Sequence, residues 1–191
     1  MRKDIVDFLE QEIKRRCASP SNFFGIGCYY HIRAVVDNAK RLAKEYSADE
    51  EIVIIAGWLH DIASITSIEL YEQHHIHGAE ISKRILSSFE YEEVKIEKVC
   101  QCILNHRGSI QRERLSIEEQ CVADADALAH FFDVPGLMYL AYVKKKMDID
   151  EGRCFVRNKL MRSYAKLSEP TKLLYEDMCK HVLDIFGDYR R

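Results

Sequence analysis

Several histidine and aspartate side chains are placed where they could bind a metal ion. The pair His60-Asp61 directly follows the apolar run at residues 52–59, so an imidazole and a carboxylate lie at the end of an apolar segment. Together these groups suit divalent ions such as Mn, Fe, Co, Ni or Zn. A polar group beside the core costs roughly 2–7 kcal/mol unless it has a partner, and a metal ion would be one. The other candidates are His31, His74, His106 and either Asp124 or Asp126.

The elements that must position these side chains are predicted to be helices. Only 3 prolines and 8 glycines interrupt the 191 residues, and apolar residues recur at helical spacing rather than in strict alternation. We expect an all-α fold, with a packed loop at residues 23–28, a polar irregular stretch at 64–77 and a charged loop at 111–114. Helices are expected over about residues 3–16, from 29 onwards, 50–60, 78–88, 91–106, from 116, 135–146, 151–167 and 170–186.

The candidate ligands lie close to the ends of these predicted helices. His31 falls in a first turn, while His60 and His106 fall at the ends of two others. Asp124 and Asp126 are two residues apart on one helix and therefore project about 200° apart around its axis. Both cannot face one ion, and the apolar positions of that helix do not decide between them.

The order of these residues resembles that of the HD-domain metal-dependent phosphohydrolases, whose pattern is a His, a downstream His-Asp pair and a later Asp. The matching residues are His31, His60-Asp61 and Asp126, over roughly half the chain. The resemblance implies that these four side chains bind one divalent ion (Mn, Fe, Co, Ni, Zn or Mg), and its register favours Asp126 over Asp124. It also implies a single HD-type helical bundle over residues 1–191, with its motif-bearing core at about 29–130 and additional C-terminal helices at about 135–187.

Two further histidines are similar to those of HD subfamilies with two metal ions. His74 stands four residues before Gly78-Ala79, and His106 follows the apolar end of a predicted helix. With both, six ligands could hold a second ion, or the two histidines could contact substrate. The alternative is that His74, His75 and His77 are loop histidines that contact solvent or substrate.

The ligand set implies hydrolysis of a nucleotide or another small phosphate ester by a metal-activated water. Asp61 is expected to bind metal and to orient or deprotonate this water, with His60 as its catalytic neighbour. Arg107 is the candidate cation for the phosphate. The alternative is a non-catalytic HD-fold module that senses a nucleotide or binds another protein and keeps the metal site.

Two branches of the family are disfavoured by the sequence. Ile62-Ala-Ser64 stand where some HD nucleotidases and alarmone hydrolases carry acidic residues, and the Gly-Tyr-Pro signature of cyclic-dinucleotide phosphodiesterases is missing. A small nucleotide or another soluble phosphate ester remains the expected substrate.

Composition limits the classes of partner. A formal net charge of −3 and a pI near 6.2 offer no general attraction for nucleic acid. No apolar run approaches a membrane span or a signal-peptide core, so we expect a cytoplasmic protein that binds neither nucleic acid nor membrane. The 7 cysteines lack CxxC spacing and are expected to stay reduced. The helices after Pro135 are a candidate homodimer interface.

Overall fold

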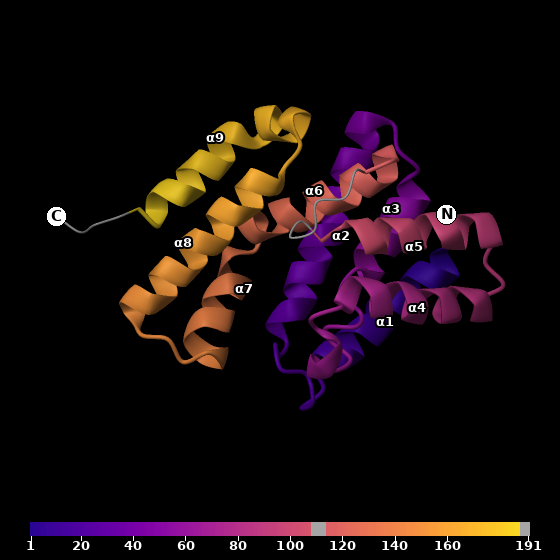
Figure 1. Ribbon diagram of the computed structural model, residues 1–191, viewed down its shortest axis with the longest axis horizontal. Coiled ribbons are helices and arrows are strands. Elements are labelled where there is room, and N and C mark those ends of the chain that lie inside the picture. The colour runs from indigo at the N-terminus through magenta and orange to yellow at the C-terminus, as the bar shows by residue number, and fades with distance from the viewer. Residues whose placement is uncertain (108–113, 188–191) are drawn as a thin grey trace.

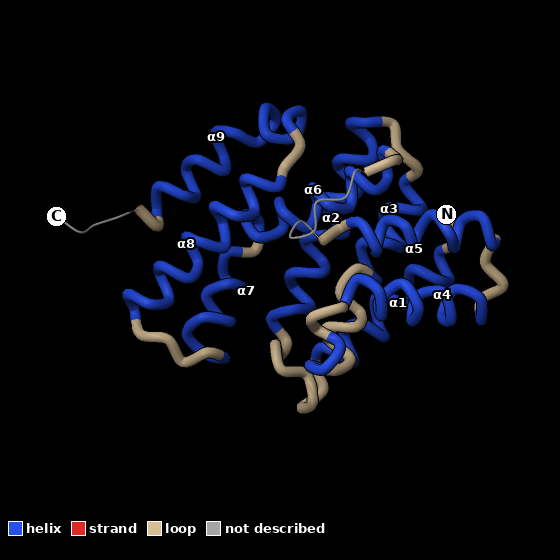
Figure 2. Tube along the Cα trace, in the orientation of Figure 1, coloured by secondary structure: helices blue, strands red, loops and turns tan. Residues whose placement is uncertain are grey.

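The structure is a computed structural model that describes residues 1–107 and 114–187, and within these ranges all regular structure is helical (Figures 1 and 2). The all-α prediction is confirmed. Residues 111–113 of the predicted charged loop lie outside the described ranges. The elements are α1 (Lys3–Cys17), α2 (Gly27–Tyr46), α3 (Glu50–Leu59), a 3-10 turn η1 (Ile68–Leu70), α4 (His74–Ser88), α5 (Glu93–Asn105), α6 (Ile117–Phe132), α7 (Val134–Met138), a π-helical segment η2 (Tyr139–Lys144), α8 (Ile149–Lys166) and α9 (Glu169–Ile185).

Several helix ends are shifted by one or two residues from the prediction, and two elements differ more. Helix α4 begins at His74 rather than near residue 78, because the backbone already forms helical hydrogen bonds there, with the amide of His77 donating to the carbonyl of Gln73. The polar run His-His-Ile-His has no apolar spacing that could have predicted this turn. The predicted helix at 135–146 is divided into α7 and η2, and the wider π turn begins at Tyr139.

The centre of the fold is α3, in which every residue from Glu51 to Leu59 is buried. Asp49 caps its start by accepting hydrogen bonds from the amides of Glu51 and Ile52. Helices α1, α2, α5 and α6 pack around it, which explains why its sequence is apolar on all sides. The helix therefore ends at His60 inside the molecule.

The C-terminal helices lie on one side of the closely packed pair α2 and α6 (Figure 1). Helix α8 packs on α6 and η2, while α9 lies at the outer edge of the molecule and packs mainly on α8. This arrangement brings α8 beside α6, which carries Asp126 in its C-terminal half. Among the described residues, no helix combines the length and the apolar character needed to span a bilayer.

Glu51 is a buried carboxylate that ties three separate parts of the chain to the start of α3. Its oxygens lie 2.9 Å from the N-terminal amino group, 2.7 Å from the hydroxyl of Tyr91 and 3.2 Å from Nζ of Lys95. Burial alone would raise the pKa of Glu51, but these donors lower it from 4.5 to about 2.

We therefore expect Glu51→Gln to lower the free energy of unfolding at pH 7 by about 1–3 kcal/mol, because buried donors lose their charged acceptor. The folded-state pKa is depressed, so this contribution is present above pH 4.5 and is lost as the pH falls towards 2. Urea denaturation at pH 7 and pH 3 measures the difference in the free energy of unfolding between the variant and the unchanged protein. This difference should be smaller at pH 3. Glu45→Gln, on an exposed position of α2, is the control; an equal loss in both variants would contradict the prediction.

Candidate metal centre

All six predicted ligands lie together, in two groups of three. One group contains His31, His60 and Asp126, and the other contains Asp61, His74 and His106. Within each group the ligand atoms lie within 4.8 Å of one another. The side chains come from α2, α4 and α6 and from the residues that follow α3 and α5. Residues up to 95 positions apart (126 − 31) are thus brought into one cluster.

The two carboxylates join the groups. Asp61 places Oδ2 at 3.5 Å from Nε2 of His60 and Oδ1 at 3.6 Å from Nε2 of His74, so it faces both groups. Oδ1 of Asp126 lies 3.3 Å from Nε2 of His31 and 3.9 Å from Nε2 of His60. The six side chains therefore form one continuous set of donors rather than two separate sites.

Three of the histidines are oriented in the same way by their own backbone. Each places Nδ1 within hydrogen-bond distance of the carbonyl three residues earlier: His60 with Gly57 at 2.8 Å, His74 with Tyr71 at 2.8 Å and His106 with Ile103 at 2.6 Å. A neutral ring that donates from Nδ1 carries its lone pair on Nε2. Metal-binding histidines are typically fixed by such a bond to the second nitrogen.

The remaining nitrogens fit a metal ion. Nε2 of His60 is buried and has no hydrogen-bond partner among the described residues. Nε2 of His74 and Nε2 of His106 are 3.2 Å apart, so two lone pairs face each other if both rings donate from Nδ1. An ion that accepts these lone pairs would remove the conflict and supply the missing partner.

The pKa values of the histidines and aspartates in the cluster depend on one another. Burial alone would raise the pKa values of Asp61 and Asp126, but the facing histidines hold both well below their usual range. Burial would lower the pKa of His60, yet the two carboxylates raise it to about 9. Burial and the neighbouring His60 lower the pKa of His106 to about 3. The two carboxylates thus favour a positive charge beside them, and burial favours the neutral form of His106.

The structure separates the roles of Asp124 and Asp126. Asp124 is fully buried and accepts hydrogen bonds from the amide of Ser168 at 2.9 Å, from its hydroxyl at 2.6 Å and from the hydroxyl of Thr171 at 2.7 Å. It therefore fastens the start of α9 to α6. Asp126 faces His31 instead, and this geometry favours Asp126 as the ligand.

The other predicted residues are placed as follows. Arg107 lines the cluster's hollow and donates to the backbone carbonyl of Glu72, whose carboxylate lies 4.0 Å away. His75 is buried in the first turn of α4, and Nδ1 of His77 lies 3.7 Å from the carboxylate of Glu80. Of the three histidines in this turn, His74 is the one that faces the cluster.

Sequence reasoning missed three residues beside the cluster. His130 lies one helical turn beyond Asp126, its ring centroid is 4.7 Å from that of His31, and its Nδ1 is 3.3 Å from the hydroxyl of Ser163. Its position four residues after Asp126 was a usable signal. Lys159 and Lys166 reach the same hollow from α8, and only the packing of α8 on α6 places them there.

The comparison with protein families identifies the chain. Residues 28–130 match the HD domain family, which is more than half of the chain. The chain belongs to the HD domain family, whose members are often metal-dependent hydrolases.

Solved structures of similar fold cover almost the whole chain. YpgQ of Bacillus subtilis superposes with a TM-score of 0.69 at 19% identity, over 96% of this chain and 92% of that one. YpgQ in complex with ADP gives 0.65 at 18% identity, over 94% and 93%. A predicted HD superfamily hydrolase from an uncultured Thermotogales bacterium gives 0.56 at 18% identity, over 97% and 93%. These similarities show that the chain shares the fold of these proteins.

A curated relative is closer in sequence. An uncharacterised protein of Clostridium beijerinckii is 33% identical over 85 residues, which is 42% of this chain and 54% of that protein. The match therefore spans about half the length of that relative.

Proposed function

We propose that this protein is a metal-dependent phosphohydrolase that acts on a nucleotide or another small phosphate ester. The observation that carries the proposal is the convergence of six ligand side chains in which the buried Nε2 of His60 has no hydrogen-bond partner among the described residues. A structural cluster of histidines and aspartates would be expected to satisfy such an atom internally.

The grouping of the side chains supports a site for two ions. His31, His60 and Asp126 would hold one ion, while His74 and His106 would hold the other, with Asp61 facing both. Such ions, when bound, polarise a phosphoryl oxygen and lower the pKa of water.

The chain's own residues have distinct tasks in this reaction. Asp61 is placed between the two groups to accept a hydrogen bond from the attacking water, and the hydroxyl of Ser64, which donates to Oδ1 of Asp61 at 3.2 Å, fixes its orientation. Nε2 of His60 lies 3.5 Å from the other oxygen of Asp61, so both atoms face the same space. Arg107 and the two lysines of α8 would neutralise the charge of the phosphate.

A nucleotide is the preferred substrate class for two reasons. YpgQ, which shares the fold, was crystallised with ADP. The cluster also opens into a hollow that carries three cationic side chains, Arg107, Lys159 and Lys166, which suits a ligand with more than one negative charge.

Removal of the metal is expected to reduce both activity and thermal stability. The purified protein should contain close to stoichiometric transition metal, because the buried carboxylates and histidines stabilise the fold only when their charges and lone pairs are satisfied. Elemental analysis and melting curves before and after EDTA treatment measure this, with Mn, Co or Ni added back as the control. A metal-free protein that takes up none of these ions and melts unchanged would contradict the site.

The reaction is tested with nucleotides and other phosphate esters in the presence of Mn, Co, Ni or Mg, with phosphate or pyrophosphate release as the readout. Turnover that disappears with EDTA and returns with metal is the expected result. Retained metal without turnover of any compound would favour the sensing module instead.

A further inference from the structure

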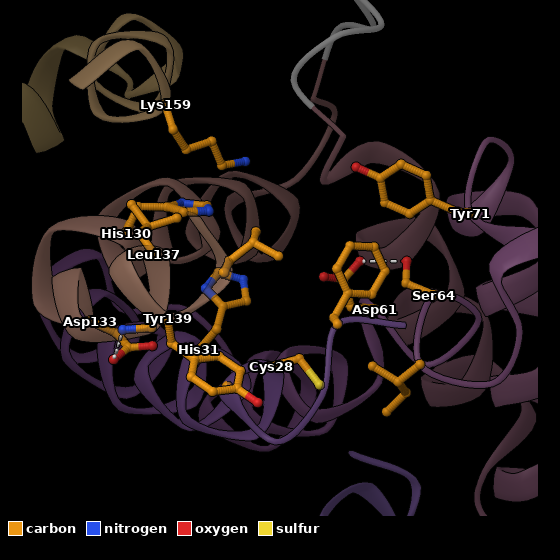
Figure 3. Close-up of a pocket in the computed structure, with 15 residues that line it drawn as sticks. Cys28, His31, Asp61, Ser64, Tyr71, His130, Asp133, Leu137, Tyr139 and Lys159 are labelled. Atoms are coloured by element: carbon orange, nitrogen blue, oxygen red, sulfur yellow. Dashed lines mark hydrogen bonds between the residues drawn. The ribbon is translucent and has the colours of Figure 1, made fainter. Parts of the chain in front are cut away.

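Two hollows meet at the metal cluster. They share five lining residues, His31, Asp61, Tyr71, His130 and Lys159. One hollow is polar, since the rest of its lining consists of His74, His106, Asp126, Arg107 and Lys166. The second hollow extends away from the cluster between the start of α2 and the segment from α7 to η2, and Figure 3 shows its lining. A ligand bound at the cluster can therefore reach into a second space of different character.

The second hollow is apolar and aromatic. Its side walls include Phe24, Ile65, Leu137, Tyr139 and Leu140 in addition to Tyr71. Its empty space, including the space at its open mouth, is about 730 Å³.

Three polar side chains of this hollow already have partners within the protein. Ser64 donates to Asp61, the thiol of Cys28 donates to the carbonyl of Gly25, and Asp133 accepts from the amide of Gly136. A ligand rich in hydroxyl groups would find few partners here, whereas a flat apolar ring would contact most of the wall.

The aromatic walls are held by local backbone structure. Tyr139 opens the π-helical segment and lies so close to α2 that a Cβ atom on Gly27 would sit 2.8 Å from its ring. The rings of Phe24 and Tyr71 are tilted against each other with centroids 5.2 Å apart, and Tyr71 in turn stacks on His74 with centroids 5.8 Å apart. Aromatic rings thus lead from the apolar hollow to the metal ligands.

Lys159 stands where the two hollows meet. Figure 3 shows its side chain extending from α8 past His130 towards the side on which Tyr71 lies. Within the described ranges it forms no ion pair and no hydrogen bond, although it is half-buried. A half-buried ammonium group that faces a cavity is best satisfied by an anion of the ligand.

We propose that the apolar hollow binds the base of a nucleotide while Lys159 binds its phosphate against the metal cluster. The inference rests on the proposed function, because it takes the cluster as the place of the phosphate. It goes further in assigning part of substrate recognition to the segment from residue 134 to residue 166, which lies beyond the part that matches the HD family and contributes Leu137, Tyr139, Leu140 and Lys159 to the hollow. The base stacks on the aromatic walls, and the phosphate lies at the junction.

Two ligands that differ only in the nucleoside test this assignment: α,β-methylene-ADP and methylenediphosphonate. Calorimetric titration of the metal-loaded protein should give at least tenfold tighter binding of the nucleoside-bearing ligand. Leu140→Trp, which fills the apolar hollow from a half-buried position, should weaken α,β-methylene-ADP at least tenfold and leave methylenediphosphonate unchanged. Lys159→Met should weaken both ligands about tenfold, whereas Lys180→Met, on an exposed position of α9, should change neither.

The outcomes separate this inference from the proposed function. Equal affinity of the two ligands, or unchanged binding of α,β-methylene-ADP to Leu140→Trp, would overturn the inference while the phosphate site stands. Failure of both ligands to bind the metal-loaded protein would overturn the proposed function as well. If Leu140→Trp does not fold by circular dichroism, Phe24→Ala takes its place and should weaken the nucleoside-bearing ligand alone.

Discussion

Replacing Asp61 with alanine should reduce kcat at least about 1,000-fold, which corresponds to about 4 kcal/mol of lost transition-state stabilisation. Asp61 faces His60 with one oxygen and His74 with the other, so its loss removes a donor from both ligand groups together. The variant should also hold less metal and melt at a lower temperature, since the histidines around it lose the charge that balances a bound ion.

Kinetic assays, elemental analysis and melting curves on the same preparations measure these three effects. Asp37→Asn, which removes a carboxylate from an exposed position of α2, is the matched control and should behave like the unchanged protein. An Asp61→Ala variant with full metal content and an unchanged melting temperature would show that Asp61 does not link the ions. Unchanged turnover in that variant would remove it from the catalytic residues.

Asp124→Ala should mainly lower stability and Asp126→Ala should mainly lower metal content, although only Ala125 separates the two residues on α6. Asp124→Ala leaves two donors of Ser168 and the hydroxyl of Thr171 without their buried acceptor. At about 1–3 kcal/mol for each orphaned group, the free energy of unfolding should fall by roughly 3 kcal/mol or more. Its metal content should be retained wherever the variant is folded.

Asp126→Ala should instead lose the ion held with His31 and His60, and turnover with it, because Asp126 is the carboxylate of that group. Urea denaturation and elemental analysis distinguish the two variants, and Ser168→Ala provides a smaller version of the Asp124 effect without touching α6. Loss of metal from a folded Asp124→Ala protein, together with normal metal in Asp126→Ala, would reverse the assignment.

The parts of the fold that could be predicted are those marked by patterns within one short stretch of sequence. Helical spacing of apolar residues predicted the all-α fold, and the unbroken apolar run before His60 predicted a buried helix, as α3 is. The first turn of α4 was not predicted because residues 74–77, His-His-Ile-His, show no helical spacing of apolar residues. The π turn at Tyr139 likewise has no distinct pattern in the sequence.

The candidate site was predictable where the order of ligands along the chain was informative, and not where packing alone brings residues together. The choice between Asp124 and Asp126 depends on Ser168, 44 residues further along the chain, which no spacing rule on α6 could reveal. Lys159 reaches the cluster only because α8 docks on α6. Such contacts between distant segments are visible only in three dimensions.

The bond from each of three histidines to a carbonyl three residues earlier has a consequence for how this molecule could be changed. His60, His74 and His106 take their orientation from stretches of four residues, so each of these rings is oriented by its own turn of the chain. The walls of the apolar hollow are contributed by segments as far apart as Phe24 and Lys159. Changes to wall residues away from the cluster, such as Phe24, Leu137 and Leu140, should therefore redirect the protein to another phosphate ester and leave the turns that orient these histidines intact.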